Sequence, residues 1–302
     1  MEIQRTLKPV EFIFTTKEQG EGVGAKVRRY IGGRHIPNLD PFLMLDMARV
    51  KLPAAFPDHP HRGFETVSYN LQGEFLHEDF RGHKGRLGPG DVQWMTAGRG
   101  IMHSEIPSSY DEESIGFQLW INLDKKNKFC EPRYQEIKKE NIPVYQKDSS
   151  FKAKVISGEV LGVKGPIEAV TPTYYIDFTM DRGQKYDHPI PAGWNSFILV
   201  YKGKIAIQDD ESKQVAEGQA ALFELTEGEE QVIRLQSLED QTGLILLAGK
   251  PINEPIVQGG PFVLNTKEEL MQAYSDFQNG VNGFEGANTW KSQNRKMMVK
   301  RQ

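Results

Sequence analysis

Short apolar runs, separated by turns that contain Gly and Pro, recur along most of the chain. In residues 117–123 (FQLWINL) every odd position is apolar, which is typical of a strand with one buried face. Further runs of strand length lie at residues 66–71, 91–96, 196–201 and 243–249. Many short strands at close intervals predict an all-β fold of the sandwich or barrel type.

Two stretches of the first half have counterparts in the second half. Residues 65–75 (ETVSYNLQGEF) align with residues 195–205 (NSFILVYKGKI), with a glycine after the apolar run in each. Residues 88–95 (GPGDVQWM) align in the same way with residues 216–223 (AEGQAALF). We infer an internal duplication of one β-barrel unit.

A polar stretch near residues 125–150, rich in Lys and Glu, is interpreted as the linker between the two copies. The predicted domains are therefore residues 1–130 and residues 131–302.

After residue 250 the spacing of apolar residues changes from that of a strand to that of a helix. Thr266 and Glu269 form the signature of a capping box, and Gly280 is suited to end the helix. We expect this C-terminal helix to pack on a barrel as part of the second domain.

Composition excludes several classes of protein. The net charge of −4 gives no general attraction to nucleic acid or to anionic membranes. The single cysteine, Cys130, excludes an internal disulfide and a cysteine-based metal site. There is no signal-peptide-like apolar segment at the amino terminus and no apolar run long enough to span a bilayer. We therefore expect a soluble protein that binds neither nucleic acid nor membrane.

Three of the seven histidines form a pattern with one glutamate. His59 and His61 are two positions apart, as are His103 and Glu105. In an extended strand, residues i and i+2 point to the same face, roughly 6.5–7 Å apart at Cα. Two such pairs on neighbouring or facing strands would present three imidazoles and one carboxylate to one point. The pattern predicts a site for one metal ion.

The residue types leave several metals and two carboxylates open. Imidazole together with carboxylate suits Fe, Mn, Cu, Ni and Zn, and the absence of thiolates argues against a structural zinc site. Glu65 competes with Glu105, because it has the same parity as His61. Along a straight strand, however, Glu65 lies roughly 13 Å from His61 at Cα. Geometry alone therefore favours Glu105 without excluding Glu65.

Apolar residues close to these ligands in sequence are candidates for the walls of a pocket that takes a flat aromatic ligand. They are Phe56, Phe64, Trp94 and Met95. The remaining histidines lack a partner at i+2 and are interpreted as structural: His35, His77, His83 and His188.

Longer motifs surround these residues. They are FPDHPHRGFETVSY at 56–69, HEDF followed by GH within 77–83, and GDVQWMTAGRGIMHSEIP at 90–107. With these motifs the sequence resembles the pirin family, two-domain members of the cupin superfamily. The resemblance extends over nearly the whole chain and is closer to eukaryotic than to bacterial pirins.

The resemblance implies two stacked cupin-type β-barrels, that is a bicupin, in one monomer. It also implies a single iron ion in the N-terminal barrel, held by His59, His61, His103 and Glu105. In that family, the residue at the position of Glu65 does not bind the metal. The second barrel is implied to be free of metal.

The resemblance implies two alternative functions. The first is an activity of the quercetin 2,3-dioxygenase type, in which O2 opens the central ring of a flavonol and Glu105 acts as the catalytic base. The alternative is a nuclear, iron-dependent, redox-sensing transcription coregulator that binds transcription-factor complexes. Such a role would place the protein in the nucleus and the cytoplasm.

A basic cluster formed by Lys26, Arg28 and Arg29 is the candidate partner surface. Lys26 departs from the resemblance, because Arg is usual there and has a bidentate fork that Lys lacks.

Overall fold

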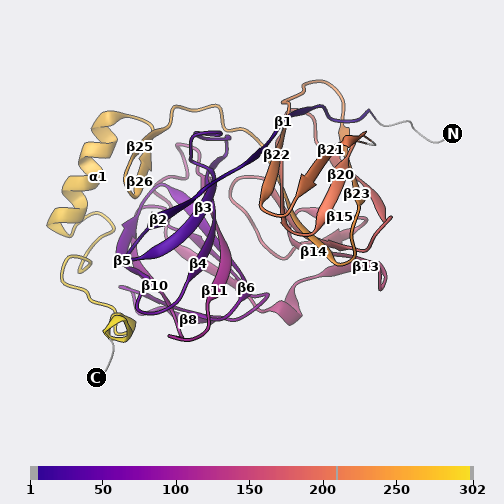
Figure 1. Cartoon of the computed structure of the whole chain (residues 1–302). Coiled ribbons are helices and arrows are strands. Elements are labelled where there is room, and N and C mark those ends of the chain that lie inside the picture. Colours follow the sequence, from indigo (N-terminus) through magenta and orange to yellow (C-terminus); the bar gives the residue numbers. More distant parts are fainter. Residues whose placement is uncertain (1–5, 209, 300–302) are drawn as a thin grey trace. The chain divides into compact units, whose positions relative to one another are not determined.

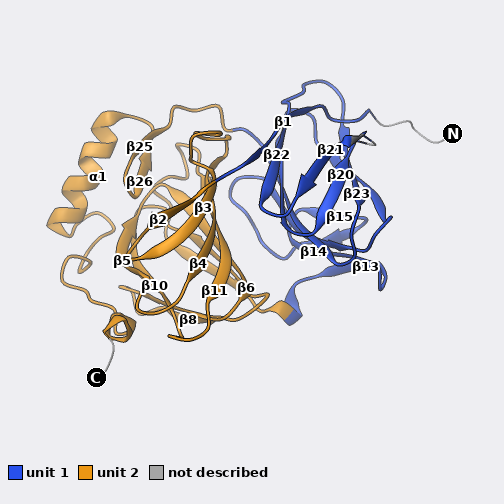
Figure 2. Ribbon diagram, viewed as in Figure 1, with its two compact units in different colours: residues 1–16, 140–251 blue, residues 17–139, 252–302 orange. Residues whose placement is uncertain are grey.

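The computed structural model describes residues 6–208 and 210–299 (Figure 1). The chain divides into two compact units, and each unit is assembled from two separate segments (Figure 2). Unit 1 contains residues 1–16 and 140–251, and unit 2 contains residues 17–139 and 252–302. These bounds differ from the expected domains 1–130 and 131–302, because each end of the chain belongs to the unit built mainly by the other half.

Unit 2 contains a seven-stranded and a four-stranded sheet, both antiparallel throughout. The larger sheet has the order β12-β9-β6-β11-β4-β3-β2 and the smaller one β5-β10-β7-β8. The strands of the larger sheet are β2 (Glu18–Glu21), β3 (Ala25–Ile31), β4 (Phe42–Val50), β6 (Phe64–Gln72), β9 (Val92–Thr96), β11 (Ser114–Asn122) and β12 (Arg133–Ile137). Those of the smaller sheet are β5 (Phe56–His61), β7 (Phe75–Asp79), β8 (Lys84–Leu87) and β10 (Ile101–Pro107).

Unit 1 repeats this pair of sheets, with the orders β1-β22-β19-β24-β17-β14-β13 and β18-β23-β20-β21. The larger sheet contains β1 (Val10–Thr15), β13 (Val144–Asp148), β14 (Phe151–Ser157), β17 (Thr173–Met180), β19 (Asn195–Lys202), β22 (Gln219–Phe223) and β24 (Thr242–Gly249). The smaller sheet contains β18 (Lys185–Ile190), β20 (Lys204–Ile207), β21 (Asp210–Ala216) and β23 (Gln231–Ser237). A two-stranded ribbon pairs β15 (Glu159–Val160) with β16 (Val163–Lys164).

The shared strand order confirms the predicted all-β fold and its internal duplication. β6 corresponds to β19 and β9 to β22, as the aligned sequence stretches predict. Gly73 and Gly203 follow the first pair with φ of 66° and 76°. A Cβ atom would lie 2.8 Å from the Glu113 carbonyl oxygen at Gly73 and 2.7 Å from Thr242 Oγ1 at Gly203. Only glycine therefore fits either turn without strain.

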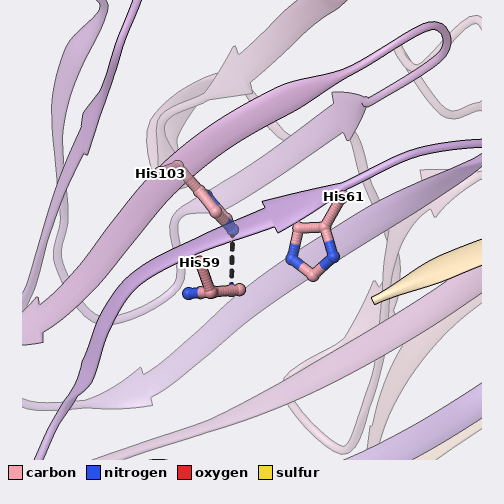
Figure 3. A group of neighbouring side chains, drawn as sticks. All are labelled: His59, His61 and His103. Atoms are coloured by element: carbon pink, nitrogen blue, oxygen red, sulfur yellow. Dashed lines mark hydrogen bonds between the residues drawn. The ribbon is translucent and has the colours of Figure 1, made fainter. Parts of the chain in front are cut away.

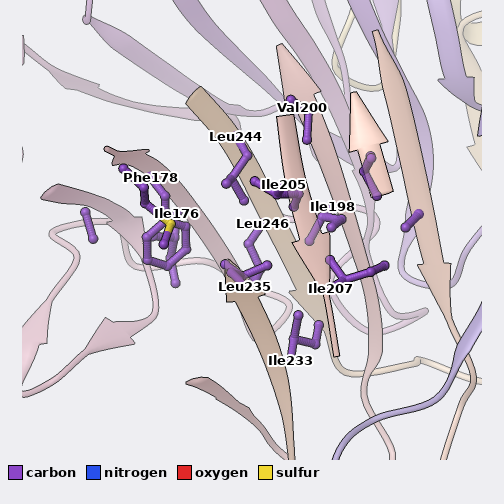
Figure 4. Packing of buried hydrophobic residues seen from close by; sticks show 14 of the residues in the cluster. Ile176, Phe178, Ile198, Val200, Ile205, Ile207, Ile233, Leu235, Leu244 and Leu246 are labelled. Carbon is purple, nitrogen blue, oxygen red and sulfur yellow. The ribbon is translucent and has the colours of Figure 1, made fainter. Parts of the chain in front are cut away.

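The core of unit 1 lies between the inner faces of its two sheets (Figure 4). Ile198 and Leu246 come from the larger sheet, and Ile205, Ile233 and Leu235 from the smaller one; all five are buried. Because successive residues of a strand point to opposite faces, these aliphatic side chains project from the two sheets into one shared core.

The structure confirms the predicted C-terminal helix and its caps. In α1 (Lys267–Asn279), Thr266 is the N-cap, Thr266 and Glu269 form the reciprocal capping box, and Gly280 ends the helix in the left-handed conformation. The helix packs in unit 2, after the hairpin of β25 (Val257–Gly259) and β26 (Phe262–Leu264). It is therefore not part of the expected second domain.

Packing and pairing explain both differences from the expected domains. α1 contacts β25 and β26, and its residue Ala273 is buried in an apolar cluster with Phe262 and Phe284. At the other end of the chain, β1 pairs with β22 and takes the edge position in unit 1 that β12 takes in unit 2.

Two short 3₁₀ helices, η1 (Lys139–Asn141) and η2 (Asn294–Met298), complete the secondary structure of the described residues. No helix among these residues has the length and apolar character needed to cross a membrane.

Candidate metal centre

Three histidines of unit 2 converge at one point (Figure 3). His59 and His61 lie on β5, and His103 lies on the adjacent strand β10, directly opposite His59 in the register. Since His59 and His61 are two positions apart, their side chains project from the same face of β5. One ligand atom from each of the three imidazoles lies within 4.8 Å of the others.

Hydrogen bonds fix the orientation of two of these rings. His59 Nδ1 lies 2.8 Å from the carbonyl oxygen of Pro57, which can only accept, so Nδ1 carries the proton and Nε2 has the lone pair. His59 Nε2 faces His103 Nε2 at 3.0 Å, and His103 Nδ1 lies 3.0 Å from His77 Nε2. The Nε2 atoms of His59 and His103 thus both point into the convergence point.

His61 shows that this point suits a cation. The side chain is 1% exposed, and neither ring nitrogen makes a regular hydrogen bond within the described part of the chain. Burial, reinforced by His59, lowers the pKa of His61 well below its usual range, and the Pro261 backbone opposes this only in part. Burial likewise lowers the pKa of His103 strongly. Both rings are neutral at physiological pH, which is the form that binds metals.

Glu105 lines the cavity next to the histidines but lies outside the three-histidine group. The Ser68 hydroxyl donates to Oε1 at 2.7 Å, and the Gln118 amide donates to Oε2 at 2.8 Å. Burial raises the pKa of Glu105, and these two hydrogen bonds oppose that effect. The role of Glu105 as fourth ligand remains a prediction.

Glu65 has a different environment. It is fully buried, and the Thr96 hydroxyl donates to its Oε1 at 2.6 Å. Among the described residues that line the cavity, Glu105 is present and Glu65 is absent. The structure thus adds a second reason to prefer Glu105.

A cavity of about 870 Å³ opens beside His59, His61 and Glu105. This volume is in the range of small-molecule sites. Its walls combine apolar and polar side chains, which include Phe56, Leu43, Met44, Ser68, Phe117, Gln118 and Trp120. The cavity can therefore take a largely apolar ligand while a few polar groups orient it.

Only one of the four expected pocket residues, Phe56, lines this cavity. Phe64 lies behind the site instead, where its ring contacts His61 at 5.1 Å and Trp120 at 4.5 Å between centroids. Trp94 and Met95 are fully buried on β9, a strand between β6 and β12. Every residue of β9 is buried, so both of its faces are covered by protein and neither side chain reaches the cavity.

The sequence missed Trp120 and Gln118, which stand at even positions of β11. The predicted buried face of this strand is present, because Phe117, Leu119 and Ile121 are buried. The opposite face resembles a solvent-exposed surface in sequence, but it lines the cavity. The Trp120 ring lies edge-on to His61, with 5.2 Å between the ring centroids.

The basic cluster is divided between two environments. Arg29 is half-buried, and its guanidinium donates to both carboxylate oxygens of Asp46 and, at 2.7 Å, to Glu21. Lys26 and Arg28 are exposed, and Lys26 lies 3.1 Å from Glu18. Arg29 therefore forms part of the cavity wall. That a protein partner binds the surface of Lys26 and Arg28 stays a prediction.

Among its described residues, unit 1 has the corresponding strands but not the same three histidines. Asp187-His188-Pro189 on β18 repeats Asp58-His59-Pro60 on β5. His188 is retained, but the positions that correspond to His61 and His103 are occupied by Ile190 and Ile233. These replacements turn the equivalent point of unit 1 into apolar core.

Comparison with known proteins agrees with this duplicated architecture. A family model described as Pirin matches residues 24–121, and one described as Pirin C-terminal cupin domain matches residues 175–283. The chain belongs to the pirin family.

Curated pirins resemble this chain over almost its full length. It is 50% identical over 287 residues to Pirin from Homo sapiens, which covers 94% of this chain and 97% of the relative. It is 49% identical over 276 residues to a Pirin-like protein from Solanum lycopersicum, with coverages of 91% and 93%.

A solved structure of quercetin 2,3-dioxygenase from Acinetobacter baumannii is also similar. It superposes with a TM-score of 0.82 at 33% identity, and covers 91% of this chain and 98% of the bacterial one. The two-cupin fold of this pirin is thus shared with a protein named for flavonol oxidation.

Proposed function

We propose that this pirin is an iron-dependent dioxygenase of the quercetin 2,3-dioxygenase type. The observation that carries the proposal is the convergence of three histidines at the wall of a cavity of about 870 Å³. The similarity to a quercetin 2,3-dioxygenase at 33% identity supports the substrate class.

The donor set fits a redox-active metal. His59, His61 and His103 would hold the ion through neutral imidazoles, and Glu105 would supply a carboxylate. Imidazole and carboxylate donors with open positions are typical of non-haem iron oxygenases. When bound, the iron would act as a Lewis acid toward the flavonol oxygens and promote reaction with O2.

The cavity walls would orient the flavonol. Phe56 and Trp120 offer ring surfaces, and Leu43 and Met44 add apolar contacts. A flat aromatic molecule packed on these side chains excludes water from the neighbourhood of the histidines.

Glu105 would accept the proton of the substrate hydroxyl after its carboxylate shifts off the metal. Ser68 and Gln118 hold the two oxygens of its carboxylate in the cavity wall. Because burial raises the pKa of this carboxyl, it retains a proton more readily than an exposed glutamate.

The test is turnover by iron-loaded protein. With quercetin and O2 we expect O2 consumption, loss of flavonol absorbance, carbon monoxide and a ring-opened product. His61→Ala should lose bound iron and turnover together, whereas His35→Ala, which removes an exposed histidine of the same unit, should keep both. Wild-type turnover by a folded His61→Ala variant would refute the proposed site.

A pair of isosteric variants separates the two glutamates. Glu105→Gln should lower kcat by about 100-fold or more, because it removes both the proton acceptor and the proposed carboxylate ligand. Glu65→Gln alters a buried carboxyl that does not line the cavity and should retain turnover. The reverse pattern would assign the catalytic carboxylate to Glu65.

A further inference from the structure

A second group of potential ligands lies outside the proposed iron site. His77 on β7, His83 in the turn after β7 and Glu136 on β12 each offer one ligand atom within 4.8 Å of the other two. These histidines belong to the HEDF and GH motif, which the proposed dioxygenase reaction does not use.

His77 lies between the two groups and can offer one ring nitrogen to each. With an ion on both sides, its contact with His103 holds a single proton, so one of these two rings is an imidazolate. The Nε2 atom of His77 lies 3.0 Å from His103 Nδ1. The Nδ1 atom of His77 is buried and has no hydrogen-bond partner within the described residues, although the side chain is only 1% exposed. An unpartnered buried nitrogen of this kind is costly unless something binds it.

His83 is held in place by its neighbours. The Asp79 carboxylate accepts from the backbone N–H of His83 at 2.8 Å and from the hydroxyl of Tyr134 at 2.9 Å. The Tyr134 ring stacks on the His83 ring, with centroids 4.0 Å apart and planes inclined by 10°. The Nδ1 atom of His83 is also buried without a hydrogen-bond partner among the described residues.

Glu136 is oriented in the same way. The Gln93 amide donates to its Oε1 at 2.6 Å, and this oxygen lies 3.7 Å from His83 Nε2. A Cβ atom at Gly85 would lie 2.5 Å from the same oxygen, so the glycine leaves room for the carboxylate. Each of the three side chains therefore has a second residue that sets its direction, as is usual around bound metals.

We propose that His77, His83 and Glu136 bind a second divalent transition-metal ion, for which Zn²⁺ is the representative. Two imidazoles and one carboxylate form a known zinc donor set that leaves a position for water. Ligands at zinc lie about 3.4 Å apart, given bonds of about 2.1 Å in a tetrahedron. The three ligand atoms lie within 4.8 Å of one another, so the partly exposed His83 and Glu136 would close in by at most about 1.4 Å.

The bound ion would link β12, an edge strand, to the hairpin of β7 and β8. The simpler alternative is an ion pair between His83 and Glu136 without any metal.

Zinc stoichiometry of the full-length, tag-free protein tests the proposal. In equilibrium dialysis against Zn²⁺, metal-free wild type should bind two ions, and His83→Ala and Glu136→Gln one each. Glu136→Gln is isosteric and partly exposed, so it keeps the fold if His83→Ala does not. His35→Ala should bind two ions, as the matched control for the loss of a histidine.

The iron site provides an internal reference. His61→Ala should lose one zinc ion and keep the ion that Glu136→Gln loses, so failure of the dioxygenase proposal leaves this result intact. The same number of zinc ions in wild type and in Glu136→Gln would overturn the second site and leave an ion pair only.

Discussion

A hydrogen bond between two imidazoles connects the proposed iron ligand His103 to His77. With a metal at Nε2 of His103, the proton of that ring lies on Nδ1 and points at His77 Nε2, 3.0 Å away. His77 thus fixes both the tautomer and the angle of the ligand ring, from a position with 1% exposure.

His77→Ala should therefore weaken iron binding by roughly 10–100-fold, the usual cost of removing a partner of a metal ligand. His83→Ala is the control, because it alters the second group without touching His103. Iron affinity can be measured by competition with a chelator. Equal affinity of His77→Ala and wild type would show that the contact does not orient His103.

Lys128 is a buried cation next to Gly63, which lies between β5 and β6. It is 1% exposed, and its ammonium donates to the carbonyls of Gly63 and Val263, both at 3.0 Å, and to Asn122 Oδ1 at 2.7 Å. Burial lowers the pKa of Lys128 to about 8 from 10.5. Between these values the unfolded chain holds more protons than the folded one, so stability rises with pH.

Relative to Lys128→Met, wild type should therefore gain about 2 kcal/mol of unfolding free energy between about pH 7.5 and 9.5. Urea titrations of both proteins at the two pH values measure this difference, in which other titrating groups cancel. A constant difference would mean that Lys128 keeps an ordinary pKa in the folded state.

At the residue scale, the sequence predicted best those side-chain positions that depend only on the spacing of residues along a strand. The i, i+2 pairs place His59 and His61 on one face of β5, and the structure brings His103 to them. Spacing cannot distinguish a cavity from solvent, which is why Trp120 and Gln118 were missed. Nor can it show that β9 is covered on both faces, so Trp94 and Met95 were assigned wrongly to the pocket.

At the scale of elements, α1 is joined to the proposed iron site through Arg62, which directly follows His61. The Arg62 guanidinium is 1% exposed and binds Asp276 of α1 at 2.7 Å. It also donates to the carbonyls of Asn282 and Arg99, at 2.7 and 2.6 Å. The helix therefore compensates a buried charge next to a proposed ligand.

Asp276→Ala should cost about 3–5 kcal/mol, because it leaves the Arg62 charge buried without its partner. Thr266→Ala on the same helix removes only the N-cap and should cost about 1 kcal/mol. Chemical unfolding of both variants compares the two effects. Similar losses would indicate that the ion pair contributes no more than an ordinary cap.

The helix also shows which features local sequence signals can predict and which they cannot. Thr266, Glu269 and Gly280 defined its ends correctly, because capping depends on residues close in sequence. The choice of unit depends on contacts with distant residues such as Arg62, and the sequence pattern contains no information on these.

At the scale of the whole molecule, the duplication was visible in sequence because each copy needs glycine at the same turn. The repeat Asp-His-Pro at 58–60 and 187–189 also marks the corresponding strands β5 and β18, although the alignment of the two halves did not include it. The bounds of the two units were not visible in the sequence. An edge strand can come from any segment that offers a free row of backbone groups.

The exchange of chain ends between the units has a consequence for biosynthesis. β1 leaves the ribosome early, but its partner β22 begins only at Gln219. Unit 2 is nearly complete by residue 139, yet its Arg62 waits for Asp276 and Asn282. Unit 2 therefore cannot finish folding during synthesis of its own half, whereas unit 1 has all of its strands once residue 251 has been added. A nascent chain therefore carries β1 without its partner until β22 has been added, and the Arg62 charge without its partners until Asp276 and Asn282 follow.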